Sequence, residues 1–227
     1  MASAALTAFL SALPEISHLR VPAIEGGTLG SSMNRVRAVG RAQTVLLSSH
    51  FERYIYQANE EAVTYLNTKQ VVAGNLPAEV KLLHSKDPID LLGSTAWERR
   101  EEHLRSLVSS DMWLWAQGST GQLDHSRLLG WMTAPKPKNL VRYYKYWSIN
   151  DIFSAITRTQ QTRNRLWLGV QELVDKRNSI AHGDYSAQAT LVDVRRFERS
   201  VRDFCERADR QLGKSIFRIA GASNPPW

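Results

Sequence analysis

Apolar residues recur at three- and four-residue steps along most of the chain, which is the spacing of an amphipathic helix. The longest such stretch is Met33–Leu66, where Leu47, Phe51 and Tyr54 share one face and no proline interrupts. No segment of useful length alternates apolar and polar residues as a half-buried strand would. The pattern therefore predicts an all-α fold built around one long helix.

Shorter helices are predicted after a break at Gly74, Asn75 and Pro77. Their expected ranges are Ala78–His84, Ser94–Trp115, Gln122–Met132, Asn139–Trp147, Asn150–Thr157, Arg163–Ala181 and Leu191–Leu212.

Residues 1–32 are expected to form an N-terminal arm. After a short amphipathic piece to Leu13, Pro14, Pro22 and the stretch from Gly26-Gly27 to Ser31-Ser32 break any regular element.

The charge and the cysteine count narrow the function classes. The chain has 29 Lys+Arg against 22 Asp+Glu, a net charge of +7, which favours nucleic acid as a partner ahead of a membrane surface. An ordinary, mildly basic protein is the alternative. The single cysteine, Cys205, excludes an intrachain disulfide and a cysteine-based zinc site, so we expect a cytoplasmic protein. Residues 1–13 lack a basic start, and no apolar run approaches 18 residues, so we expect no secretory signal and no membrane partner.

The segment with the clearest chemistry is Asp175–Asp184, which reads DKRNSIAHGD. It ends a helix with cations and a histidine, which the helix dipole favours, and Gly183 is the expected terminator. Asn178 and His182 are four apart and share a face, whereas Arg177 lies about 140° from His182 around the helix. An ordinary basic helix end is the alternative. The other histidines are dispersed and no glycine-rich phosphate loop occurs, so we expect no metal and no cofactor.

Residues 177–183, RNSIAHG, resemble the Arg-x4-His motif of the HEPN superfamily. Ala42–Tyr56 resembles the long helix of its RiboL-PSP-HEPN and MAE_28990-like branches, and the helices near 139–153, 165–183 and the closing helix follow in the order of that branch. The resemblance covers about residues 33–215. It implies a HEPN-like helical bundle with a variable helical insertion over 68–135, between the first long helix and the motif helix, and a tail over 216–227.

The resemblance also implies a reaction, because many HEPN proteins are metal-independent endoribonucleases in which the RNA 2′-OH attacks the adjacent phosphorus. His182 would then move the proton, Arg177 would stabilise the developing charge and Asn178 would orient the phosphate. A polar residue of the long helix often completes such sites. Glu52 is the candidate here and His50 a weaker one, and a structural salt bridge between Glu52 and Arg177 is an equal alternative.

Further residues are expected to contact RNA: Lys176, Asp184 and Tyr185 border the motif, and Arg142 and Lys145 lie in the aromatic segment 142–147. The rings of that segment share one helix face, which favours packing instead. In the related toxin branch the tyrosine lies two residues after the histidine, but Tyr185 lies three after His182, so control by adenylylation is not expected.

The partners follow from the resemblance. It implies a homodimer with the active site at the dimer cleft, RNA as substrate (tRNA or another structured RNA), and a toxin or antiviral defence role with an antitoxin or a defence complex as partner. The alternative is a non-catalytic HEPN module for RNA binding or assembly.

Overall fold

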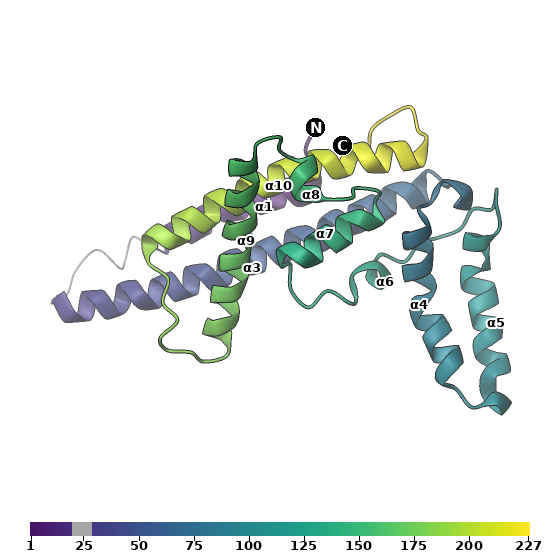
Figure 1. Ribbon diagram of the computed structural model, residues 1–227, viewed down its shortest axis with the longest axis horizontal. Helices are drawn as coiled ribbons and strands as arrows, with labels where there is room; N and C mark the ends of the chain where they lie inside the picture. Colours follow the sequence, from purple (N-terminus) through teal and green to yellow (C-terminus); the bar gives the residue numbers. More distant parts are fainter. Residues whose placement is uncertain (20–28) are drawn as a thin grey trace.

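A single long helix forms the spine of the molecule. The computed structural model describes residues 1–19 and 29–227, and helix α3 spans Leu29–Thr68 (Figure 1). Leu47, Phe51, Ile55 and Ala58 are fully buried on its inner face, which packs against helices α1, α9 and α10. The predicted long helix is confirmed, and it extends slightly beyond both expected ends.

Helix α1, Ala4–His18, belongs to the core instead of forming a loose arm. It packs on α3 and α10, and its buried face continues past Pro14 to the fully buried Ile16. The predicted break at Pro14 is therefore wrong. A proline inside a helix costs roughly 3 kcal/mol, and the tertiary packing of the apolar face compensates for it.

The start of α1 is held by carboxylates from two other helices. Ser3 caps the helix and also hydrogen-bonds the buried carboxylate of Asp209 in α10, while Glu61 of α3 accepts from the first backbone N–H groups. The predicted breaks at Pro22 and Gly26-Gly27 lie outside the described residues. The predicted break at Ser31-Ser32 is wrong, because α3 has already begun.

The middle of the chain forms a helical hairpin that extends away from α3 (Figure 1). Its helices are α4, Ala78–Ser94, and α5, Arg100–Asp111, with the single-turn 3-10 segments η1 (Ala73–Asn75), η2 (Trp97–Arg99) and η3 (Met112–Trp115) around them. The sequence predicted a shorter first helix and a second one from Ser94. The backbone of Thr95, the C-cap residue, is extended with ψ 141°, so α4 ends there and α5 begins only at Arg100.

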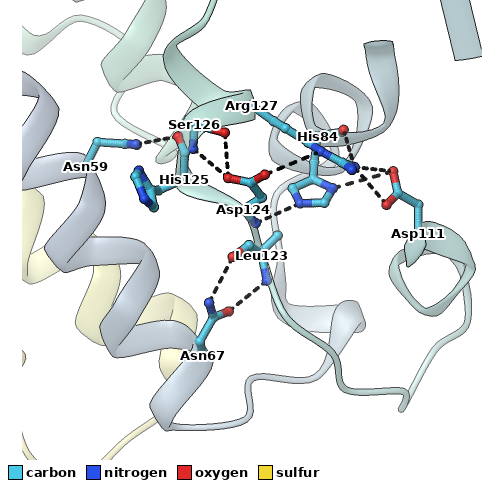
Figure 2. Close-up of polar contacts among 9 residues, drawn as sticks. All are labelled: Asn59, Asn67, His84, Asp111, Leu123, Asp124, His125, Ser126 and Arg127. Carbon is cyan, nitrogen blue, oxygen red and sulfur yellow. Dashed lines mark hydrogen bonds and ion pairs between the residues drawn. The ribbon is translucent and has the colours of Figure 1, made fainter. Parts of the chain in front are cut away.

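A buried polar cluster ties this hairpin to α6, His125–Leu129 (Figure 2). The carboxylate of Asp111 is fully buried and accepts from Nη1 of Arg127 at 3.0 and 3.1 Å. Nδ1 of His84 lies 3.6 Å from the same carboxylate, and its Nε2 accepts from the backbone N–H of Asp124 at 2.8 Å. Nε2 of His84 accepts this hydrogen bond and so carries no proton, and burial lowers the pKa of His84 in the same direction.

Two short helices bring aromatic side chains into the core. Helix α7 spans Pro137–Tyr146 and helix α8 spans Ile152–Ala155. Tyr143, Tyr144 and Trp147 are fully buried. The packing interpretation of this aromatic segment is therefore confirmed.

Helices α9, Gln160–Ala181, and α10, Leu191–Ala220, complete the bundle. Thr190 and Asp193 form a reciprocal capping box at the start of α10. The last helix passes its predicted end at Leu212, and Trp227 folds back against Gly213. Helices and 3-10 turns are the regular elements throughout residues 1–19 and 29–227, which confirms the all-α prediction. None of the described helices combines the length and apolar character needed to cross a membrane.

Candidate active site

The motif lies at the carboxyl end of α9, where a complete Schellman turn closes the helix. His182 is the C-cap, Gly183 follows with φ +81°, and the N–H groups of Gly183 and Asp184 bond the carbonyls of Ile180 and Ser179. The expected glycine terminator is confirmed. This turn presents the side chain of His182 to solvent at the end of the helix.

Arg177 and Asn178 form the second part of the site, one turn before the histidine. Nη1 of Arg177 donates to Oδ1 of Asn178 at 3.1 Å, which leaves the rest of the guanidinium free to meet an anion. In the described residues no acidic side chain pairs with Arg177, and no hydrogen bond joins its side chain to His182. The backbone N–H of His182 donates to the carbonyl of Asn178 at 2.9 Å, and no hydrogen bond joins the two side chains among the described residues.

The loop after the motif is fastened to α3. The carboxylate of Asp184 accepts from Ser186 and from the N–H of Ala187, and the hydrogen bonds from Ser186 lower its pKa. An added Cβ at Gly40 would lie 2.1 Å from the carbonyl oxygen of Ala189, so only glycine lets the loop come this close to the helix. The loop after the motif is therefore held by its own hydrogen bonds at Asp184 and by the contact of Ala189 with α3.

Arg41 fastens the same loop, and the sequence analysis did not single it out. Its Nη1 donates to the carbonyl of Asp184 at 3.1 Å, and its guanidinium lies 5.7 Å from the centre of the Tyr185 ring. The preceding Gly40 was the available signal, since a glycine inside a helix indicates the close approach of another segment.

Glu52 lies on α3, half-buried, one helical turn before Tyr56. The pKa of Tyr56 is raised by partial burial and by the charge of Glu52, and its hydroxyl donates to the carbonyl of Met132. No ion pair of the described residues joins Glu52 to Arg177. His50 faces the other way, with Nε2 3.3 Å from a carboxylate oxygen of Glu15 in α1.

The remaining expected RNA contacts are spread over the molecule. Lys176 lines a groove between α9 and α10 with Asp193. The guanidinium of Arg142 lies 4.2 Å from the ring centre of Trp131 and donates to the hydroxyl of Tyr146, so it supports the aromatic packing. Lys145 is exposed on α7. Of the expected residues, Arg177, Asn178, His182, Asp184 and Tyr185 lie at the end of α9 and in the loop that follows it.

Comparison with known proteins matches the HEPN_MAE_28990-like HEPN family over residues 11–216. No curated protein and no solved structure matches the chain. The matched range contains the long helix, the insertion and the motif, and it begins inside α1. The chain therefore belongs to the MAE_28990-like family of HEPN proteins.

Proposed function

We propose that this protein is a metal-independent endoribonuclease whose active site is the carboxyl end of α9. The observation that carries the proposal is an exposed histidine at the helix C-cap, five residues after an arginine that has no acidic partner in the described part of the chain. Membership of the HEPN family supports it, because this family is rich in ribonucleases.

The reaction needs one proton acceptor and one cation. His182 accepts the proton of the RNA 2′-OH as this oxygen bonds to the adjacent phosphorus, and the bond from phosphorus to the 5′-oxygen breaks. The leaving 5′-oxygen takes up a proton from solvent water, so the products are a 2′,3′-cyclic phosphate and a 5′-hydroxyl. Arg177 stabilises the additional negative charge on the phosphorus oxygens, and Asn178 holds the guanidinium in place.

Two copies of the chain supply this site together. Among the described residues no hydrogen bond joins Arg177 to His182, and the two positions lie about 140° apart around an ideal helix, which favours a homodimer in which two motifs share one cleft. A mostly apolar groove between α3 and the motif helix is a suitable seam for a second copy. It is lined by Ala42, Val45, Leu46, Ser49 and Ile180, together with Arg41. We expect Val45→Glu to separate the copies.

The substrate and the setting are proposed from family membership and charge. RNA is the polyanion that a chain of net charge +7 attracts, and a tRNA or another structured RNA with a single-stranded loop is the substrate we propose. A toxin or defence role in the cytoplasm, with an antitoxin or a defence complex restraining the enzyme, follows from the same family.

Cleavage of total RNA in EDTA tests the proposal. Wild type should cleave, whereas His182→Ala and Arg177→Ala should each lose roughly 100-fold or more in rate. His18→Ala is the matched control, because His18 is also an exposed histidine in the last turn of a helix, and it should cleave like wild type. Equal cleavage by His182→Ala would refute the assignment of the site. RNA binding without cleavage by wild type would support the non-catalytic module instead.

A further inference from the structure

Tyr185 is an exposed aromatic side chain directly beside the motif. It is 86% exposed, three residues after His182, on the loop that leaves the end of α9. Its position next to the proposed reacting groups makes the ring a candidate contact for the substrate.

The backbone on both sides of Tyr185 is held by contacts within the protein, although the ring itself is exposed to solvent. On one side, the carboxylate of Asp184 is bonded to Ser186 and Ala187, and Arg41 donates to the carbonyl of Asp184. On the other side, Ala189 rests on Gly40 of α3. A rigid loop with an exposed ring loses little conformational freedom when a flat ligand stacks on it.

The charges around Tyr185 suit an anion. The guanidinium of Arg41 lies 5.7 Å from the centre of the ring, and Arg37 is one turn earlier on the same helix face, without an ion pair in the described residues. The one carboxylate on the adjoining backbone, that of Asp184, is engaged in its own loop. A ligand whose ring stacks on Tyr185 could therefore place a phosphate next to the positive charges of Arg41 and Arg37.

A groove lies between the start of α3 and the segment after this loop. It is lined mostly by apolar atoms, and its residues are Met33, Val36, Arg37, Gln188, Ala189 and Thr190. Nucleotides combine a flat, apolar base face with a charged phosphate. The Tyr185 ring and the apolar groove suit the base, and Arg41 and Arg37 suit the phosphate.

We propose that Tyr185 and Arg41 form a base-stacking subsite for a nucleotide of single-stranded RNA, next to the bond that is cleaved at His182. The base stacks on the exposed face of Tyr185. Arg41 holds the loop and contacts the adjoining phosphate, and the following nucleotide enters the groove along α3. This subsite rests on the proposed ribonuclease function, since it places the substrate for that reaction.

Binding of a short single-stranded RNA that carries 2-aminopurine tests the subsite, with His182→Ala as the background so that the RNA stays intact. Stacking on Tyr185 should quench the fluorescence of this base. Tyr185→Ala should lose the quench and weaken binding about 10-fold, whereas Tyr185→Phe should keep both. Arg41→Ala should weaken binding and lower the salt dependence, the slope of log K against log salt, by about 0.7.

Trp97→Ala provides the matched control. Trp97 is also an exposed ring beside a cation, with the Arg100 guanidinium 5.6 Å from its centre, but it lies at the tip of the α4–α5 hairpin. Its loss should leave quench and affinity unchanged. Unchanged binding by Tyr185→Ala, or an equal loss in Trp97→Ala, would overturn the subsite.

The two proposals can fail separately. If wild type cleaves RNA and Tyr185→Ala leaves both KM and the quench unchanged, the subsite is wrong and the ribonuclease stands. If the quench depends on Tyr185 but wild type leaves RNA intact, the subsite stands and the ribonuclease is wrong.

Discussion

Replacing Gly40 by alanine perturbs the motif from the far side of its loop. The added Cβ would lie 2.1 Å from the carbonyl oxygen of Ala189 and 3.2 Å from its carbonyl carbon, whereas ordinary contacts begin near 3.4 Å. The oxygen belongs to the backbone and cannot rotate away. The loop or the helix must therefore move by more than 1 Å.

Two opposing effects set the change in stability. Overpacking of this kind costs about 1–3 kcal/mol. Alanine inside a helix returns about 1 kcal/mol relative to glycine. The net loss in the free energy of unfolding is therefore at most about 2 kcal/mol, which a folded domain survives. The rate of RNA cleavage should nevertheless fall on the order of 100-fold, because a displacement of about 1 Å near reacting groups has an effect of that size.

Urea unfolding and the rate of RNA cleavage, measured on the same preparation, separate these effects. Gly93→Ala is the control, since Gly93 lies in helix α4 with nothing within 4 Å of the added Cβ. It should be slightly more stable than wild type and cleave at the same rate. Wild-type cleavage by Gly40→Ala would refute the reasoning that the contact with α3 positions the loop.

Three further predictions concern the hairpin and the helix end. Asp111→Ala leaves Arg127 and His84 without their carboxylate and should lower the free energy of unfolding by roughly 3 kcal/mol in urea titrations; a loss below about 1 kcal/mol contradicts the buried pair. Burial lowers the pKa of His84 in the folded protein, so below the ordinary histidine pKa of 6.5 the unfolded chain binds more protons than the folded chain. The free energy of unfolding should therefore fall as the pH falls through 6.5. His84→Gln should flatten this pH dependence. An unchanged curve of unfolding free energy against pH would refute the role given to His84. Gly183→Ala, at φ +81°, should lower the melting temperature through a loss of about 1 kcal/mol, and an unchanged melting temperature would speak against the Schellman turn.

The helices, and the residue at which α9 ends, could be predicted from local sequence patterns. The apolar spacing placed α3 and α10, and the glycine after a basic turn placed the end of α9 at His182. These features depend on residues that are neighbours in the chain, so a single sequence contains the information.

Features that depend on distant contacts were missed or predicted wrongly. Pro14 stays inside a helix because Ile16 is buried by α3 and α10, which no local rule reports. Arg41 reaches a carbonyl 143 residues later in the chain, so its role depended on the fold. Asp111 carried a usable signal, because a carboxylate among the apolar positions of α5 and η3 indicates a buried partner.

The chemistry of the cleaved RNA ends, with purified wild type and His182→Ala incubated in EDTA, decides whether His182 catalyses cleavage without a metal. We expect 2′,3′-cyclic phosphate and 5′-hydroxyl ends from wild type and no new ends from the variant. Cleavage that EDTA abolishes, 5′-phosphate ends, or the same ends from both proteins would contradict this expectation.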